Sequence, residues 1–217
     1  MRTPFVRLSV SLSVAIATIL SAGTACAQSN VIKFGVAEYT THSRSNGITG
    51  VGVPPGADAE TGDAPTVIVE YERLITPNVG VELALGIPPR IKARATGSVA
   101  FLGDDVLSAR NVSPVLLMTY HFGSPGDKWR PYVGVGANYT TFRSIKSRLA
   151  PKVEMGDSYG WAAKGGIEYV VNQDWSVFAS VTALKVKTKL VASGATVLQT
   201  TIDIRPVIYT LGAAYRF

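Results

Sequence analysis

The run Val79-Gly80-Val81-Glu82-Leu83-Ala84-Leu85-Gly86-Ile87 alternates between two kinds of side chain. Its odd-numbered positions are all Val, Leu or Ile, and its even-numbered positions are Gly, Ala or Glu. Successive side chains of a β-strand point to opposite faces, so this period of two predicts a strand with one aliphatic face. A strand of a soluble β-sandwich can have the same faces, and the rest of the chain must decide between a sandwich and a membrane barrel.

Seven further stretches show the same period and are rich in Val, Ile, Thr, Tyr and other aromatic residues, as strands are. No stretch after residue 27 has the period of an amphipathic helix. We therefore expect an all-β chain with eight strands, at Asn30–Thr40, Thr66–Leu74, Val79–Ile87, Val112–Phe122, Arg130–Phe142, Ser158–Val171, Trp175–Leu190 and Thr200–Phe217.

The connections between these strands alternate in length. Short turns are expected at Ile75–Asn78, Gly123–Trp129 and Asn172–Asp174, and long loops at Thr41–Pro65, Pro88–Asn111, Arg143–Asp157 and around Val191–Gln199. An even number of strands with short turns at one end and long loops at the other is typical of outer-membrane barrels. A sandwich fits less well, because the faces opposite the aliphatic ones carry Gly and Ala beside charges, as a narrow lumen does. The predicted fold is an eight-stranded antiparallel transmembrane β-barrel.

Composition and the N-terminus bound the class of protein. The 217 residues, 47% hydrophobic and 17% charged, suit one domain. Arg2 and Arg7 precede an apolar, Ser-rich run that ends in Ala25-Cys26-Ala27, so we expect a signal peptide at 1–27 and the barrel at 28–217. A single-pass anchor is the alternative for the first segment. Removing it lowers the formal net charge from +6 to +4, and the scattered basic residues of an exported chain exclude nucleic acid as a partner.

The last predicted strand ends in Tyr215-Arg216-Phe217. Terminal alternation closed by a C-terminal Phe is similar to the signal that the barrel-assembly machinery reads in outer-membrane proteins. We therefore expect that machinery to be a partner and the outer membrane to be the location. Aromatic residues near strand ends are expected to form a girdle at the periplasmic interface, namely Tyr71, Trp129, Tyr132, Tyr169, Trp175 and Tyr215.

Several runs resemble the OmpW family of small outer-membrane barrels. They are Pro65–Tyr71, Thr76–Leu83, Val112–Leu117 with Tyr120-His121-Phe122, and Trp129–Phe142, in which Arg130-Pro131-Tyr132-Val133-Gly134 is the most specific part. Asp157–Gly160 and Asn172–Trp175 continue the resemblance. It implies an eight-stranded barrel with a narrow apolar channel that passes small hydrophobic molecules and releases them sideways into the bilayer.

The phase of each strand predicts what faces the lumen. If the first strand runs outward and each strand turns its more apolar face to lipid, most charged strand residues point inward near the periplasm. Opposite charges in so narrow a lumen should pair, because an unpaired buried charge is costly. Lys33 adds a further inward positive charge. We interpret as a periplasmic polar plug the residues Glu70, Glu72, Glu82, His121, Lys164, Glu168 and Arg216.

Aliphatic residues occupy the inward phases of the outer half, at Ile68, Val115, Leu117 and Ile208. We expect them to line a channel that favours small hydrophobic solutes, which the plug would stop and divert between strands into lipid. Pro114 and Pro206 are expected to mark weakened pairing near such an exit. Two alternatives stay open. The aliphatic residues can simply pack a closed barrel, and the protein can be a structural or adhesive barrel with functional loops.

Other chemistry has little support in the sequence. His42 and His121 lie far apart without metal-ligand spacing, and no cofactor motif is present, so we expect no metal and no cofactor. The polar run His42–Asn46 has no oriented acid beside it, and we expect no enzymatic activity. The basic loop residues are expected to contact lipopolysaccharide phosphates at the outer leaflet, and these residues are Arg90, Lys92, Arg94, Arg143, Lys146 and Arg148. Strand seven is ambiguous. Its lysines Lys185, Lys187 and Lys189 share a phase with the apolar Val181 and Ala183, so either a bulge intervenes or the lysines lie beyond the membrane.

Overall fold

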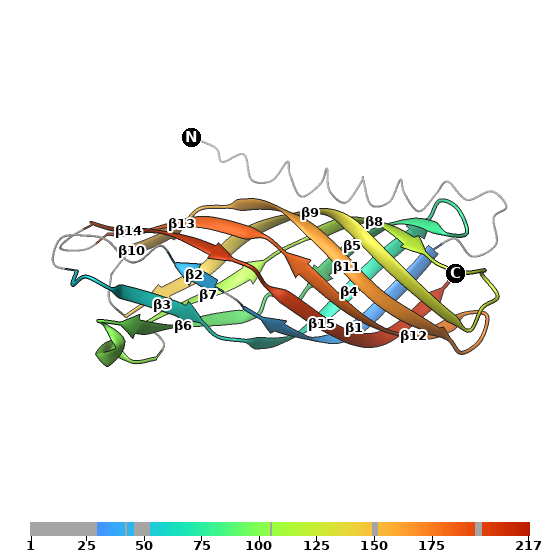
Figure 1. Cartoon of the computed structure of the whole chain (residues 1–217), viewed down its shortest axis with the longest axis horizontal. Helices are drawn as coiled ribbons and strands as arrows, with labels where there is room; N and C mark the ends of the chain where they lie inside the picture. The colour runs from blue at the N-terminus through green and yellow to red at the C-terminus, as the bar shows by residue number, and fades with distance from the viewer. Residues whose placement is uncertain (1–29, 42, 46–52, 105, 149–151, 194–196) are drawn as a thin grey trace, which may run out of the picture.

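Eight antiparallel strands close into a barrel. The computed structural model describes residues 30–41, 43–45, 53–104, 106–148, 152–193 and 197–217, and the expected signal peptide lies outside them. The order around the barrel is β1-β4-β5-β8-β9-β11-β12-β15, and β15 pairs with β1 to close it (Figure 1). These strands are β1 (Asn30–Thr40), β4 (Ala64–Leu74), β5 (Val79–Gly86), β8 (Val115–His121), β9 (Trp129–Ser147), β11 (Ser158–Val170), β12 (Trp175–Leu184) and β15 (Val207–Arg216). The predicted fold class is confirmed.

The loops predicted between strands contain more structure than expected. At the end of the barrel away from the chain's C-terminus, which we call the loop end, the strands continue into two sheets (Figure 1). In one, β3 (Ala57–Thr61), β6 (Arg90–Gly97) and β7 (Leu107–Val112) join the outer part of β9. In the other, β2 (Ser43–Ser45) pairs with β14 (Val197–Ile204), which pairs with β13 (Val186–Ser193) and through it with β10 (Lys152–Met155). A short 3₁₀ turn, η1 (Ala100–Leu102), follows β6.

Three predicted strands were too long. Val112–Phe122 is divided at Ser113-Pro114, Trp175–Leu190 at Lys185, and Thr200–Phe217 at Arg205-Pro206, and in each case the outer piece leaves the barrel for one of the two sheets. Both prolines lack the N–H that a continuous ladder needs. Of the two explanations for the lysines of strand seven, the second fits, since Lys187 and Lys189 lie on β13 beyond the barrel.

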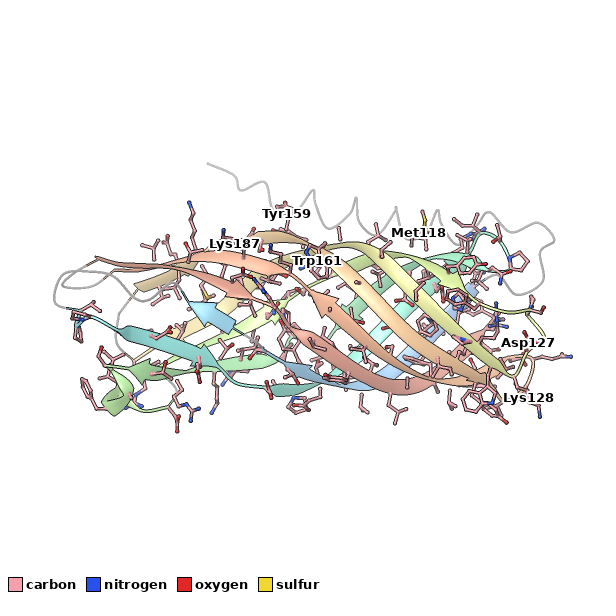
Figure 2. The ribbon with its side chains drawn as sticks, in the orientation of Figure 1. Met118, Asp127, Lys128, Tyr159, Trp161 and Lys187 are labelled. Atoms are coloured by element: carbon pink, nitrogen blue, oxygen red, sulfur yellow. The ribbon has the colours of Figure 1, made fainter. Side chains whose placement is uncertain are left out.

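Side chains of the barrel strands alternate between buried and exposed positions. In β8 the odd-numbered residues from Val115 to His121 are buried and the even-numbered residues between them are exposed. Figure 2 shows Met118, Tyr159 and Trp161 projecting outward from the barrel wall. The exposed face forms an apolar belt that includes Phe34, Val36, Val67, Val69, Leu85, Leu116, Met118, Val133, Val135, Trp161, Val177, Val181 and Leu211. Within the described residues, no helix is both long and apolar enough to cross a membrane.

Three short turns close the opposite end of the barrel, which we call the turn end, as the sequence predicted. Asn172 Oδ1 accepts the backbone N–H groups of Asp174 and Trp175, which fixes one of these turns. Trp129 packs on Tyr169 with ring centroids 4.7 Å apart, and Trp175 packs on Tyr215 at 5.0 Å. The inclusion of Tyr132 in this aromatic girdle was wrong, because its side chain is only 1% exposed and lies inside the lumen. Its phase on β9 is that of the buried Arg130, not that of the exposed Val133.

Candidate functional site

The turn-end half of the lumen is filled by ion-paired side chains. Lys33 on β1 lies between two carboxylates, with its Nζ 2.9 Å from Glu72 Oε2 and 2.7 Å from Glu82 Oε2. All three side chains are almost fully buried. They come from adjacent strands β1, β4 and β5, whose alternation turns these positions inward. The pairing supplies the partners that a buried charge requires.

A second lysine extends this arrangement across the lumen. Lys164 Nζ on β11 lies 2.7 Å from Glu70 Oε2 and 2.7 Å from Glu82 Oε1. Glu82 therefore bridges the two lysines, one through each of its carboxylate oxygens. Because β11 lies opposite β4 in the order of the eight barrel strands, the Lys164–Glu70 ion pair spans the lumen.

His121 on β8 links the lysine pairs to the end of the barrel. Its Nε2 lies 2.7 Å from Glu72 Oε1, which also accepts a hydrogen bond from the Thr119 hydroxyl. Its Nδ1 lies 3.9 Å from Glu168 Oε2, and Glu168 in turn lies 3.4 Å from Arg216 Nη2. All seven residues expected at this end thus meet in one network with Lys33, which we call the charged cluster.

Sequence reasoning missed Arg130 and the interior position of Tyr132. Arg130 is 1% exposed and donates from Nη2 to the carbonyl of Pro77 at 2.9 Å. Tyr132 stacks on His121 with ring centroids 5.2 Å apart, and Lys33 Nζ lies 4.8 Å from the centre of its ring. The signal was available, because both residues share the strand phase opposite Val133. With Arg130 included, four carboxylates face Lys33, Lys164, Arg130 and Arg216 among the described lumen residues, and the charges balance.

Glycines provide the space that these large side chains occupy. A Cβ on Gly80 would lie 2.6 Å from Glu72 Oε1 and 2.8 Å from Thr119 Oγ1. A Cβ on Gly166 would lie 2.5 Å from Cζ of Tyr132. These glycines therefore mark lumen positions where a large side chain from a neighbouring strand occupies the space that a Cβ would need.

The loop-end half of the lumen contains an apolar cavity of about 50 Å³. The four residues expected to line a channel, Ile68, Val115, Leu117 and Ile208, all line this cavity and pack in one hydrophobic cluster. Glu70 and Lys164 form its floor, so the cavity ends on the charged cluster. Sequence reasoning missed the residues that complete its lining, which include Tyr39, Thr66, Ala84, Leu85, Gly86, Pro89, Asn111, Ser113 and Thr182.

One hydrogen bond crosses the lumen at the outer rim of this apolar cavity. Asn111 Nδ2, on β7, donates to Tyr39 Oη, on β1, at 2.9 Å. Both residues are buried, each with only 3% of its surface exposed. A single neutral hydrogen bond is worth far less than the ion pairs of the charged cluster, so this rim is the weaker of the two closures.

The barrel wall beside the apolar cavity is interrupted. The β5–β8 ladder ends at the pair Ala84 and Val115, and pairing resumes only between Arg90 and Arg110 in the outer sheet. Between these pairs the two edges are joined by one long hydrogen bond, from the Asn111 N–H to the Pro89 carbonyl at 3.4 Å. We call this interruption the wall gap. Its edges are Leu85–Pro89 and Asn111–Pro114, and five of these residues also line the apolar cavity.

Prolines explain the wall gap. Pro88 and Pro89, on the β5 side of the gap, have no N–H to donate across it, and Pro114 has none to continue β8 as a regular strand. The other edges of the same segments stay paired, since Ile87 donates to Val67 at 2.9 Å and Tyr139 donates to Pro114 at 3.1 Å. Pro206, the other proline expected to weaken pairing, is bonded through its carbonyl to the Leu184 N–H at 3.0 Å.

A metal site and the polar run at His42–Asn46 are the other sites considered in the sequence. Within the described ranges, no group of three or more His, Cys, Asp and Glu side chains could hold a metal ion. His42 and Asn46, at the ends of the polar run weighed for catalysis, lie outside the described residues.

Comparison with known proteins places this geometry in a family. The OmpW family model matches residues 27–217. Outer membrane protein W of Escherichia coli strain K12 is 32% identical over 156 residues, covering 68% of this chain and 70% of that protein. The dibenzothiophene metabolism operon protein PahQ of Pseudomonas aeruginosa is 29% identical over 136 residues, 62% of each chain. The crystal structure of the outer membrane protein OprG from Pseudomonas aeruginosa has a TM-score of 0.80 at 23% identity, covering 88% of this chain and 96% of that one, and shows the same fold.

Proposed function

Because the chain belongs to the OmpW family and is an outer-membrane barrel, we propose that it conducts small hydrophobic molecules from outside the cell into the bilayer. The short turns then face the periplasm and the loop end faces outward. The observation that carries the proposal is an apolar cavity that ends on a charged cluster and opens toward the wall gap.

The two halves of the lumen treat an apolar solute differently. Contact with Ile68, Val115 and Leu117 removes apolar surface from water, which favours entry. Passage through the charged cluster would separate buried ion pairs without giving them new partners, which costs several kcal/mol. An apolar solute in the cavity therefore has no favourable route to the periplasm through the barrel.

The wall gap supplies the exit. Leu85 is exposed on the outer face of the barrel and also lines the apolar cavity, so the two surfaces meet at this residue. Opening the gap breaks the single long Asn111–Pro89 hydrogen bond, whereas opening an intact ladder breaks several. Release through this gap leaves the solute in hydrocarbon. The name of the relative PahQ links that protein to metabolism of dibenzothiophene, an apolar fused-ring compound, which supports this class of solute.

Entry of a fluorescent hydrophobic probe into proteoliposomes with a lipopolysaccharide-containing outer leaflet tests the proposal. Wild-type protein should speed entry over protein-free vesicles, and Leu117→Asp should remove the gain, because a carboxylate in the cavity repels an apolar solute. Leu116→Ser, on the exposed face of the same strand, is the matched control and should keep it. Entry at the protein-free rate with wild-type protein would contradict the proposal.

A cross-link tests the exit separately. The only cysteine of the chain is Cys26, in the expected signal peptide, so two introduced cysteines form a unique pair in the barrel. Joining Gly86→Cys to Ser113→Cys with a short thiol cross-linker should close the wall gap and stop probe entry until the linker is cleaved. Met118→Cys joined to Val135→Cys, an existing pair in the β8–β9 ladder, is the control and should have no effect. If the first cross-link leaves entry unchanged, lateral release is wrong.

A second candidate function is a structural or adhesive barrel with a plugged lumen and functional loops. The observation that favours it is the small cavity volume of about 50 Å³, below the range of about 300 to 1,000 Å³ common for small-molecule pockets. It predicts that Leu117→Asp and both cross-links leave cells and vesicles with the same probe entry as the wild type. Under this function, shortening the β13–β14 hairpin would instead change surface attachment.

Export and assembly complete the proposed route. Residues 1–27 act as the signal peptide, and the terminal strand with Phe217 is read by the barrel-assembly machinery. The C-terminus supports this role, since Phe217 and Asn30 exchange two backbone hydrogen bonds, of 2.9 and 3.1 Å, at the seam where the barrel closes. Phe217→Ala should lower the amount of folded barrel in the outer membrane, measured by heat-dependent gel mobility, and unchanged assembly would contradict this role.

A further inference from the structure

Three arginines stand side by side on the sheet above the apolar belt. Arg90 on β6 is the ladder partner of Arg110 on β7, and Arg110 is the ladder partner of Arg143 on β9. Directly paired residues of an antiparallel ladder share a face and have Cβ atoms about 4.5–5.5 Å apart. All three side chains are exposed. Like charges placed directly opposite one another destabilise a sheet, so folding alone does not favour this row.

An irregularity in β9 adds a fourth cation to the same face. Pairing of β7 with β9 shifts between Ser108, which faces Lys146, and Arg110, which faces Arg143. Between these two pairs, the single residue Ala109 on β7 opposes two residues on β9, Ser144 and Ile145, and the additional residue lets Arg143 and Lys146 point the same way. Ser144 between them has φ of 52°, the left-handed region that non-glycine residues rarely adopt. We call Arg90, Arg110, Arg143 and Lys146 the arginine row.

Asp157 interacts electrostatically with Arg143 but can balance only one of the four positive charges of the arginine row. Among the described residues, no ion pair joins a member of the row to a carboxylate. Asp157 is the acidic neighbour of Arg143, and its pKa is lowered because its carboxylate accepts a 2.5 Å hydrogen bond from Tyr139. Higher on β6, Arg94 differs, since it lies 3.8 Å from both Glu60 and Asp104.

The height of the arginine row matches the edge of the membrane. Trp129 and Tyr139 lie ten residues apart on β9 and both belong to aromatic pairs, Trp129 with Tyr169 and Tyr139 with Tyr159. Ten residues of a strand tilted by about 40° rise about 25 Å, the height of the apolar band of a membrane barrel. Arg143 follows Tyr139 by four residues and so lies about 10 Å above the band. Exposed Leu85 and Leu116 lie below Arg90 and Arg110 on the same sheet.

We propose that the arginine row binds the phosphate groups of lipid A, the anchor of lipopolysaccharide in the outer leaflet. A phosphate relieves the repulsion among the four cations and accepts charge-assisted hydrogen bonds from the guanidinium groups. The acyl chains of the same molecule then lie against the apolar belt beneath the row. An anion free in solution would contact the arginine row but not the apolar belt. A phosphorylated lipid contacts both surfaces and is therefore the ligand that fits.

Titration of the detergent-solubilised protein, recovered folded from outer membranes, tests this site. The probes are bisphosphorylated lipid A, the same lipid with both phosphates removed, and inorganic phosphate, with bound molecules counted by native mass spectrometry. Arg110→Gln combined with Arg143→Gln should raise the Kd for lipid A about tenfold. Arg94→Gln, whose guanidinium has carboxylate partners, is the matched control and should change it less than about twofold.

The other arms of the experiment decide between lipid, free phosphate and a structural role. Dephosphorylated lipid A should bind the wild type and the double variant equally weakly, and inorganic phosphate should not compete with lipid A. The double variant without lipid should keep or raise its melting temperature, because a repulsive row has been relieved. Unchanged lipid A affinity in the double variant, equal binding of the dephosphorylated lipid, or equally tight binding of inorganic phosphate would each overturn the proposal.

Discussion

The two halves of the lumen are built from the same eight strands but are closed in different ways. At the turn end, Glu82 holds two lysines and Glu72 is held by Lys33, Thr119 and His121, so each carboxylate is fixed by directional contacts. At the loop end, aliphatic side chains pack without directional contacts beside an interrupted wall. Strand phase therefore determines which side chains fill the lumen, whereas the residue type in that phase decides which half can rearrange.

Loss of Glu82 should be the most damaging single change and tests the closure of the turn-end half. Glu82→Gln leaves Lys33 and Lys164 without their shared carboxylate, and we expect a loss of about 3 to 5 kcal/mol in the free energy of unfolding. Urea unfolding in lipid vesicles, followed by tryptophan fluorescence, measures it. Glu38→Gln on the exposed face of β1 should cost less than about 0.5 kcal/mol, and equal losses would refute a paired interior.

Enlarging the apolar cavity should have the next largest effect and tests the packing of the loop-end half. Leu117→Ala is expected to cost about 2 to 4 kcal/mol of stability, because its side chain is 1% exposed in the cluster that lines the cavity. The larger cavity should also speed entry of the hydrophobic probe severalfold. Leu116→Ala, at a position 55% exposed, should change neither quantity much. Slower entry in Leu117→Ala would show that the cavity is packing alone.

Thr119→Val probes a single hydrogen bond within the charged cluster. The change keeps the shape of the side chain and removes the hydroxyl that donates to Glu72, so we expect a loss of about 1.5 to 3 kcal/mol. Ion conductance across planar bilayers should stay at background, because both lysine bridges remain. A stable conducting channel in this variant would mean that the lysine bridges do not close the lumen.

Tyr39→Phe should have the smallest effect and tests the outer rim of the apolar cavity. The variant leaves the Asn111 amide without its partner across the lumen, at a cost of about 1 kcal/mol. Because this bond spans the rim, its loss should also increase probe entry, which stopped-flow fluorescence in proteoliposomes can follow. Unchanged entry together with reduced stability would make the bond structural only.

Period-two alternation predicted the barrel and the inward charges because each strand has only two phases. Once Val81 and Leu83 face lipid, Glu82 must face the lumen, and this rule places all seven residues of the expected plug. The same rule applies to Arg130, which shares the inward phase of β9, but the sequence analysis did not include it. Proximity to a strand end predicts an interfacial position for Tyr132, but its phase on β9 turns the ring into the lumen.

Strand ends and partners could not be predicted in the same way. Pro114 and Pro206 divide strands that alternation alone continues, because the period of two carries no information about which neighbour a strand pairs with. The contact between Asn111 and Tyr39 joins residues 72 positions apart, and nothing local in the sequence indicates it. The wall gap likewise depends on two segments, Leu85–Pro89 and Asn111–Pro114, meeting across the barrel wall.

Photolabelling with an aliphatic diazirine would show which half of the lumen an apolar molecule reaches. Label positions on folded protein in lipopolysaccharide-containing vesicles would be assigned residue by residue with mass spectrometry. The lipid-facing belt will be labelled in any case. Within the lumen, we predict that the diazirine labels Ile68, Val115 and Leu117. We predict no label on Glu70, Glu82 or His121. Label confined to the belt, or label reaching His121, would contradict a conduit that ends at the charged cluster.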